Sequence, residues 1–269
     1  MERLQRIRFL NEILLSELPD YAQQAKQFAD TEQEQRRLLR SLMNVRPPMP
    51  LRADFLCEQD ILLREEVQAR GVVHVDGLPT VTGDPRLVLW QGDITRLDAD
   101  AIVNAANSAL LGCFLPCHNC IDNVIHSAAG LQLRDACAAL MQAQGHEEPV
   151  GHAKLTPAFN LPSRYVLHTV GPCVTGRVTQ AQQRELAACY RACLMLAAQH
   201  GLRSVAFCCI STGVFHFPNA LAARIAVDTV RACLAEKTPV QKVVFNVFRD
   251  EDRALYQTLL GLDEKGMAR

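Results

Sequence analysis

The sequence predicts an α/β domain of three layers, with helices on both faces of a mixed, mostly parallel sheet, preceded by a helical N-terminal extension. From about residue 86, short apolar runs suited to buried strands alternate with longer segments of helical pattern. Before that point, residues 3–44 carry Leu and Ile mostly at three- and four-residue steps, which is typical of amphipathic helices. We therefore place the extension and its linker at residues 1–84 and the α/β domain at residues 85–269.

Three helices are predicted in the extension, at residues 3–18, 22–40 and 54–69. Pro19 ends the first one, because a proline ring cannot continue a helix. The prolines of residues 45–50 stop the second, and Gly71 closes the third. Gly, Pro, Asp and Thr are frequent in residues 72–85, which indicates a hairpin or a linker.

The elements of the α/β domain are read from the alternation of apolar runs and helical pattern. Strands are predicted at residues 87–90, 101–103, 165–168, 205–210 and 243–248, and helices at residues 121–144, 179–200, 217–236 and 250–262. Ligands of such sheets bind beyond the carboxyl ends of the strands. The conspicuous polar loops follow strands, at residues 91–95, 104–120, 169–177 and 211–218, so we expect the functional site at that edge.

Composition narrows the class of protein. The chain has 269 residues, of which 49% are hydrophobic and 21% charged, and its formal net charge is −1. This balance is ordinary for a globular protein, and it shows no excess of positive charge of the kind that binds nucleic acid. No window approaches the length of a membrane span, and eleven cysteines without a secretion signal indicate reduced thiols. We expect a cytoplasmic protein with neither a nucleic-acid nor a membrane partner.

The loop after the strand at 101–103 contains a cluster of soft metal ligands. Cys113, His118 and Cys120 supply two thiols and an imidazole, which together suit Zn²⁺. Three ligands from one loop, with no second pair nearby, leave the fourth position open, as in catalytic zinc sites. Cys117 either replaces one of the three or closes the site as a fourth ligand. The alternative is that all four are incidental residues of a cysteine-rich chain.

Three polar side chains that directly follow strands are candidate ligand contacts. Asp93 can accept a hydrogen bond from an exocyclic amine such as that of adenine, or it can simply cap the next turn. Turn chemistry alone accounts for either Asn104 or Asn107. Two such amides beside a metal loop favour hydrogen bonds to sugar hydroxyls.

The turn at residues 211–215 and the helix start at Asp122 each have both a structural and a chemical interpretation. The backbone amides of a small-residue turn can cradle a pyrophosphate at a helix N-terminus, although an ordinary β–α turn has a similar sequence. The residues of that turn are Ser211, Thr212, Gly213, Val214 and Phe215. Asp122 opens the helix at 121–144, where the helix dipole favours a carboxylate whatever its chemistry. His126 and His168 lie on apolar faces, which is typical of core histidines.

Together, four motifs strongly resemble those of the macrodomain family, which are ADP-ribose-binding α/β/α modules. In chain order they are Gly92-Asp-Ile-Thr95, Val103-Asn-Ala-Ala-Asn107, Cys120-Ile-Asp-Asn-Val-Ile-His126 with Ala128-Ala-Gly130, and Ile210-Ser-Thr-Gly-Val-Phe215. The resemblance covers about residues 85–262. Residues 112–123 are similar to the hallmark Gly-Cys-Phe-x-Pro-x-His-x-Cys-Ile-Asp-Asn of the zinc-containing macrodomains, which are microbial protein-ADP-ribose hydrolases. The helical extension also resembles that group.

The resemblance implies a role for each matched residue. Asp93 would bind adenine, with Ile94 in the same substrate-binding set, Asn104 and Asn107 would bind the distal ribose, and residues 211–215 the diphosphate. The implied zinc ligands are Cys113, His118 and Cys120, and the implied catalytic residues are Asp122 and Asn123. Compared with zinc-free hydrolytic members, the metal loop replaces a glycine-rich run, and His216 replaces a glycine.

The implied activity is hydrolysis of mono-ADP-ribose from modified protein side chains, above all from acyl esters on Asp or Glu, with Zn²⁺ as the cofactor. The resemblance also implies a modifying enzyme of the sirtuin type and a small carrier protein as the substrate. Two other functions stay open. A reader that only binds ADP-ribose would need no metal, whereas a deacetylase of O-acetyl-ADP-ribose would use the same site on a small molecule.

Overall fold

The computed structural model describes residues 1–262. Within these residues, seven strands form one sheet in the order β1-β2-β7-β6-β3-β5-β4. They are β1 (Thr80–Val81), β2 (Asp84–Gln91), β3 (Ala101–Ala106), β4 (Ala153–Pro157), β5 (Tyr165–Val170), β6 (Ser204–Phe207) and β7 (Lys242–Val247). The five inner strands run parallel, and the edge strands β1 and β4 pair antiparallel. The predicted mixed sheet is thus confirmed, and residues 263–269 of the predicted domain lie outside the described residues.

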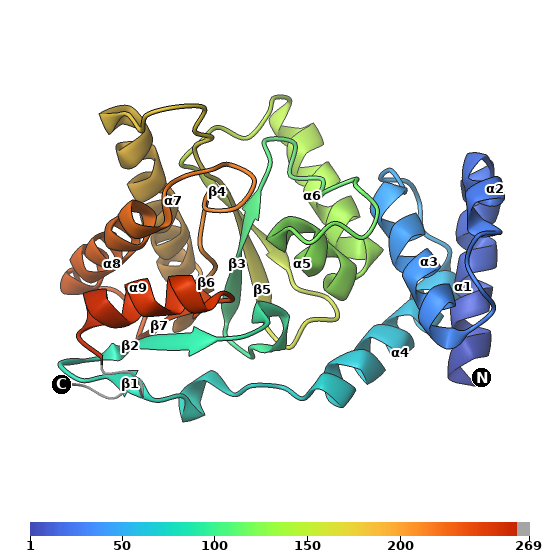
Figure 1. Cartoon of the computed structure of the whole chain (residues 1–269), viewed down its shortest axis with the longest axis horizontal. Coiled ribbons are helices and arrows are strands. Elements are labelled where there is room, and N and C mark those ends of the chain that lie inside the picture. Colours follow the sequence, from blue (N-terminus) through green and yellow to red (C-terminus); the bar gives the residue numbers. More distant parts are fainter. Residues whose placement is uncertain (263–269) are drawn as a thin grey trace.

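Helices cover both faces of this sheet. The domain helices are α5 (Ile121–Ala129), α6 (Leu131–Gln144), α7 (Gln180–Gln199), α8 (Asn219–Ala235) and α9 (Asp250–Leu260). Helices α5 and α6 lie on one side of the strands, and α7, α8 and α9 lie on the other (Figure 1). The buried residues of the strands are mostly apolar, as expected for a sheet covered on both faces. None of the helices within residues 1–262 is long and apolar enough to cross a membrane.

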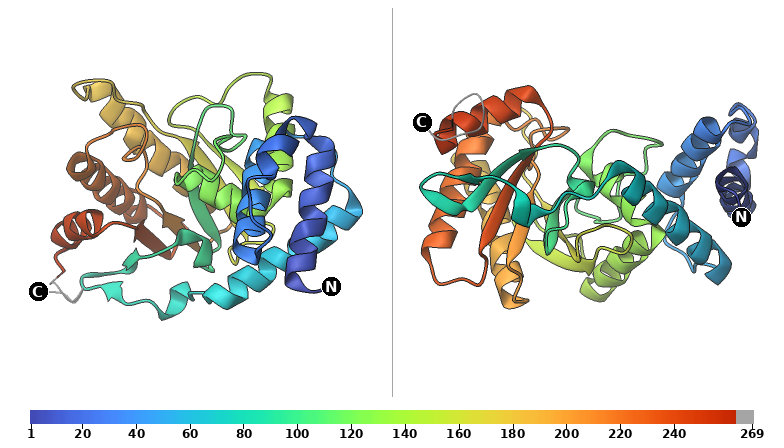
Figure 2. Two further views of the ribbon diagram at one scale, coloured as in Figure 1. Left: turned by 45° about the vertical axis from the view of Figure 1, so that its right-hand side comes forward. Right: turned by 90° about the horizontal axis from the view of Figure 1, so that it is seen from below.

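The extension packs against α5 and α6. It consists of α1 (Arg3–Glu17), the short α2 (Ala22–Ala25), α3 (Glu32–Val45) and α4 (Ala53–Arg70), and α4 leads along the lower side of the domain toward β1 (Figure 1, Figure 2). The extension has an apolar core of its own, which also takes in Leu131 of α6. Because Leu131 belongs to this cluster, the extension and the domain share buried surface.

Two predicted helices are wrong in their extent. The helix predicted at 121–144 is divided into α5 and α6 at Gly130, whose φ of 97° suits glycine and interrupts the helix. The helix predicted at 22–40 is also divided, because Thr31 begins a new helix by accepting a hydrogen bond from the amide of Glu34.

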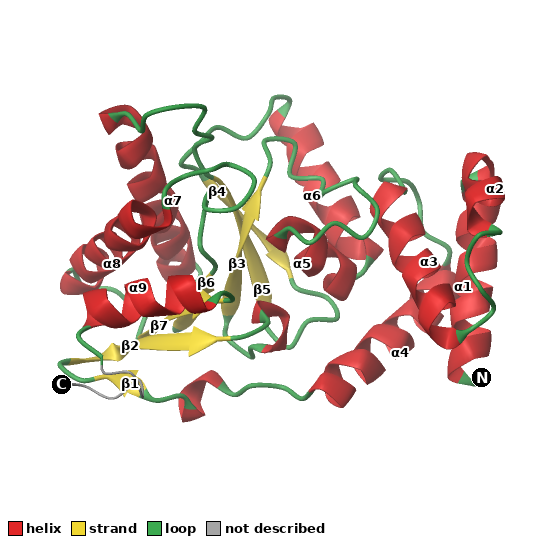
Figure 3. Cartoon of the chain, viewed as in Figure 1, coloured by secondary structure: helices red, strands yellow, loops and turns green. Residues whose placement is uncertain are grey.

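The strand predictions need two corrections. The strand predicted at 205–210 ends at Phe207, and its last residues already belong to the following loop. The edge strand β4 was not predicted, because its sequence Ala-Lys-Leu-Thr-Pro lacks a buried apolar run. Figure 3 shows that the loops after β3 and β6 lie at the same end of the sheet. The predicted site residues come from loops of this kind, at the carboxyl ends of the strands.

Candidate functional site

A buried carboxylate lies at the centre of the site. Asp122, in the first turn of α5, is only 5% exposed. The amide nitrogen of Asn104 donates a hydrogen bond to its Oδ1 (2.8 Å), and that of Asn107 donates to its Oδ2 (3.2 Å). Burial raises the pKa of Asp122 from 3.8 to about 6, and the hydrogen bond from Asn104 partly opposes this shift. The end of β3 and the start of α5 therefore bring three predicted site residues into direct contact.

Asn104 has one hydrogen-bonding atom to spare. Its amide nitrogen also lies 3.2 Å from Nδ1 of His168, while its side-chain oxygen is buried without a partner among the described residues. An unpaired buried acceptor costs roughly 1–3 kcal/mol. Asn104 is fully buried, so this oxygen is not accessible to a sugar in this structure, whereas the side chain of Asn107 is partly exposed. The ribose contact predicted for Asn104 therefore stays a prediction.

Two buried histidines lie behind the carboxylate. Nε2 of His126 is 3.5 Å from Oδ1 of Asp122, and neither ring nitrogen of His126 has a hydrogen-bond partner among the described residues. Burial lowers the pKa of both imidazoles, that of His168 to about 3. Both are core histidines, as predicted, but each is also within reach of the site.

The three predicted metal ligands converge. The ligand atoms of Cys113, His118 and Cys120 all lie within 4.8 Å of one another, and Sγ of Cys113 is 3.4 Å from Nδ1 of His118. In a tetrahedral zinc site the sulfur and nitrogen ligands are about 3.6 Å apart, as follows from the usual bond lengths. Burial and the neighbouring Cys113 raise the pKa of the Cys120 thiol to about 11, although the amide of Asn123 lowers it. The donor set and its spacing therefore fit zinc.

Cys117 is directed away from this cluster. Its thiol lies 3.2 Å from Oγ of Ser41 and 3.6 Å from the carbonyl oxygen of Arg37, both on α3. It is absent from the group formed by the other three ligand atoms. The arrangement therefore favours the ligand set without Cys117.

The side chain of Asn123 is hydrogen-bonded to the loop that contains the predicted metal ligands. Its side chain is fully buried, and its oxygen accepts hydrogen bonds from Nη2 of Arg40 (2.9 Å) and Oγ of Ser127 (3.2 Å). Its nitrogen donates to the carbonyls of Leu115 (2.9 Å) and Cys113 (3.4 Å). The predicted catalytic role of Asn123 stays a prediction, and these contacts are those of a residue that fixes the loop.

The turn after β6 offers free backbone donors. The amides of Ser211, Gly213, Val214 and Phe215 make no hydrogen bond within the described part of the chain. The amide of Thr212 points back to the carbonyl of Cys209 at 3.4 Å. Several unpaired N–H groups in one short turn form an anion-binding concavity, which agrees with the predicted diphosphate contact.

Asp93 is placed where β2 ends, but its carboxylate has partners. Its Oδ1 accepts from the amide and the hydroxyl of Thr95 (3.0 and 2.7 Å), and its Oδ2 accepts from Nη1 of Arg70 at the end of α4 (2.9 Å). It is thus both a turn cap and a half-exposed anion. The side chain of Ile94 lies in the domain core, so only its main chain is available to a ligand.

One further residue was placed wrongly by the strand predictions. Phe248 was placed in a buried strand, but β7 ends at Val247 and the Phe248 ring is 76% exposed. It lies beside the loop of Asp93, because the amide of Gly92 bonds to the carbonyl of Val247 (3.0 Å). The carbonyl of Phe248 itself accepts from the side chain of Gln91 (3.2 Å). An exposed aromatic ring at this edge is suited to stacking on a base.

Comparison with known proteins agrees with this geometry. The family model of the Macro domain matches residues 103–226. A Trypanosoma brucei macrodomain solved in complex with ADP-ribose is 31% identical and has a TM-score of 0.65, covering 82% of this chain and 95% of that one. A mutant Oceanobacillus iheyensis macrodomain solved with ADPR is 38% identical, with a TM-score of 0.61, covering 68% of this chain and 95% of that one. The chain belongs to the macrodomain family.

Its curated relatives carry a more specific name. A protein of Treponema medium called protein-ADP-ribose hydrolase is 53% identical, and the match covers 97% of this chain and 100% of the relative. A protein of the same name from Staphylococcus aureus (strain MSSA476) is 49% identical over 84% of this chain and 85% of the relative. The first match covers nearly the whole chain and so includes most of the extension, and the second is longer than the α/β domain and so includes part of the extension.

Proposed function

We propose that this protein is a protein-ADP-ribose hydrolase that releases mono-ADP-ribose from modified side chains. The relatives that match most of the chain carry this name, and the fold is that of ADP-ribose-binding macrodomains. The observation that supports the proposal most strongly is the buried carboxylate of Asp122, which two asparagine amides hold beside a cluster of two cysteines and a histidine. A protein that only binds ADP-ribose has no need for such a cluster.

The described residues suggest how the ligand lies. Adenine stacks on Phe248 and reaches Asp93. The diphosphate accepts hydrogen bonds from the free amides of Ser211, Gly213, Val214 and Phe215, and the distal ribose meets the partly exposed side chain of Asn107. This order follows the edge of the sheet from β2 and β7 through β6 to β3. The C1″ atom of the distal ribose then lies near Asp122.

The reaction breaks the bond between C1″ and the carboxylate of a modified Asp or Glu. A water molecule attacks C1″ as the carboxylate of the modified side chain leaves, and Asp122 holds this water and accepts its proton. Asn104 and Asn107 keep the carboxylate of Asp122 in place through its two oxygens. Cys113, His118 and Cys120 would hold Zn²⁺, which supplies Lewis-acid polarisation of an oxygen ligand when it is bound. The modified substrate is a small carrier protein, and a sirtuin-type transferase is the enzyme that modifies it.

The test uses the full-length, zinc-loaded protein and a substrate protein mono-ADP-ribosylated on Asp or Glu. Free ADP-ribose, measured by liquid chromatography, should accumulate, and stripping the metal with a chelator should slow its release. Tight binding of ADP-ribose without any release would instead make the protein a reader. Turnover restricted to O-acetyl-ADP-ribose would make it a small-molecule deacetylase.

The metal has a separate test. Elemental analysis should find about one zinc per chain, and the double variant Cys113→Ala with His118→Ala should lose it. Cys173→Ala is a matched control, because this cysteine is exposed and lies outside the cluster. Zinc that survives the double substitution would exclude these ligands.

A further inference from the structure

The helix α3 of the extension is hydrogen-bonded to the loop that contains the metal ligands. Nη2 of Arg40 donates to the carbonyl of His118 (3.0 Å) and to the side-chain oxygen of Asn123 (2.9 Å). Asn123 in turn donates to the carbonyl of Leu115 (2.9 Å). The guanidinium group of Arg40 therefore holds the main chain of the predicted ligand His118 directly, and it holds the main chain of Leu115 indirectly, through Asn123.

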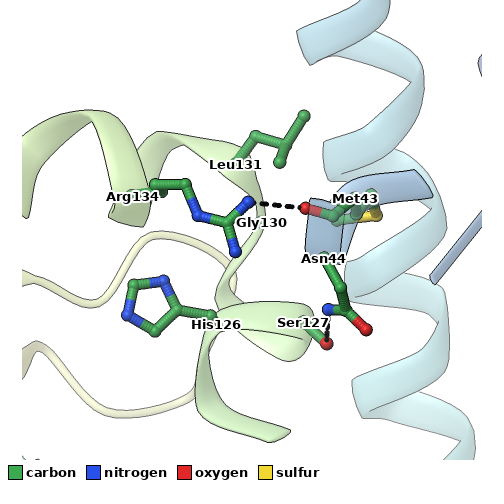
Figure 4. A pocket seen from close by; sticks show the side chains of 7 residues that line it. All are labelled: Met43, Asn44, His126, Ser127, Gly130, Leu131 and Arg134. Atoms are coloured by element: carbon green, nitrogen blue, oxygen red, sulfur yellow. Dashed lines mark hydrogen bonds between the residues drawn. The ribbon is translucent and has the colours of Figure 1, made fainter. Parts of the chain in front are cut away.

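A second residue of α3 also binds this loop. The side-chain oxygen of Asn44 accepts from the amide of Cys117 (2.9 Å), and its nitrogen donates to Oγ of Ser127 (3.0 Å) in α5. Figure 4 shows Asn44 facing Ser127 across the seam between the extension and the domain. Asn44 is 1% exposed, so these bonds are protected from competing water.

A third link runs from the domain back to the extension. Nε of Arg134, in α6, donates to the carbonyl of Leu111 (2.7 Å), and its Nη1 donates to the carbonyl of Met43 (2.8 Å) near the end of α3 (Figure 4). The same guanidinium lies 4.5 Å from the centre of the Phe114 ring, in the metal-ligand loop. Burial lowers the pKa of Arg134 to about 10, and the group stays cationic at neutral pH.

We propose that Arg40 is a positioning residue that holds the metal-ligand loop in its ligating conformation, so that α3 forms the outer wall of the metal site. The inference depends on the proposed zinc site and extends it to the N-terminal extension. Groups that orient metal ligands from outside typically change metal affinity by about 10–100-fold when they are removed. Arg40 fits that role because it bonds the main chain of His118 and the side chain that pins Leu115.

The first experiment measures zinc affinity of the full-length protein by competition with a chromogenic chelator. Arg40→Ala should weaken zinc binding by about tenfold or more. Arg40→Lys, which keeps the charge but lacks the Nη2 that donates both hydrogen bonds, should fall between this variant and the wild type. Arg37→Ala is the matched control, since its side chain is on the same helix, is 64% exposed and meets Glu34 (3.7 Å) and the ring of Phe28 (5.7 Å to its centre), both of which belong to the extension. Equal zinc affinity in Arg40→Ala and Arg37→Ala would overturn the proposal.

A second experiment separates this proposal from the metal itself. Amide hydrogen exchange of residues 113–120 is followed in the metal-free protein, with thermal unfolding as a check on the fold. Arg40→Ala should speed exchange in this segment relative to Arg37→Ala, and unchanged exchange would refute the positioning role. If the wild type binds no zinc, the metal proposal fails, and the exchange result alone decides whether Arg40 holds the loop. If Arg40→Ala does not fold, Arg40→Lys provides both measurements.

Discussion

The exposed ring of Phe248 gives a sharp test of the proposed ligand position. The substitution Phe248→Ala removes an aromatic face that has few contacts of its own, because the residue is 76% exposed. Fully burying a phenylalanine contributes about 1.5–3 kcal/mol. Since only about a quarter of this residue is covered, the variant should lose no more than about 0.7 kcal/mol of unfolding free energy.

The effect on ligand binding should be larger. Stacking of a base on an aromatic side chain contributes about 1–3 kcal/mol, so Phe248→Ala should bind ADP-ribose about 5–150-fold more weakly. Isothermal titration calorimetry with free ADP-ribose measures this directly. Met195→Ala is a suitable control, because Met195 is 60% exposed on α7 and has no place in the proposed site. Unchanged affinity in Phe248→Ala would refute the adenine position.

Three further variants test other parts of the account. Asp93→Ala should reduce ADP-ribose affinity in calorimetry more than the rate of hydrolysis at saturation, because the proposed position of adenine is far from the bond that breaks. Gly171→Ala should weaken ADP-ribose binding, since its Cβ would collide with Oγ of Ser211 and displace the loop proposed to bind the diphosphate, whereas Gly176→Ala, with no atom within 4 Å, should not. Burial lowers the pKa of His168 from 6.5 to about 3, so between pH 7 and pH 5 the unfolded chain binds a proton that the folded protein does not. Because of His168, the unfolding free energy of the wild type should fall by about 2 kcal/mol between pH 7 and pH 5. His168→Gln lacks this loss, so the difference in unfolding free energy between the wild type and the variant, measured by urea titration, should be about 2 kcal/mol smaller at pH 5 than at pH 7.

The sequence was sufficient for the fold class and for the placement of the central residues. Asp122, Asn104 and Asn107 could be found because each follows an apolar strand or opens a helix, and the topology of a parallel sheet brings such positions to one edge. The cluster of predicted metal ligands could be located because its residues are close in sequence, so that local spacing alone indicates the chemistry.

Other features depend on contacts between distant segments. The bonds from Arg40 and Asn44 to the metal-ligand loop join residues more than seventy positions apart, and no local pattern indicates them. The orientation of Cys117 toward α3 follows from the same contacts. The exposure of Phe248 was missed because the last residue of an apolar run has the same sequence signature whether the strand includes it or ends before it.

The central claim is that the site around Asp122 both binds ADP-ribose and hydrolyses its bond to a protein side chain. The most direct measurement is release of ADP-ribose from a modified protein by the wild type and by Asp122→Asn, with ADP-ribose affinity and zinc content determined on the same samples. The substitution keeps the shape of the side chain but removes the proton acceptor. We expect hydrolysis to fall by about 100-fold or more while affinity and zinc content stay close to those of the wild type. Release at the wild-type rate by folded Asp122→Asn protein would contradict the account.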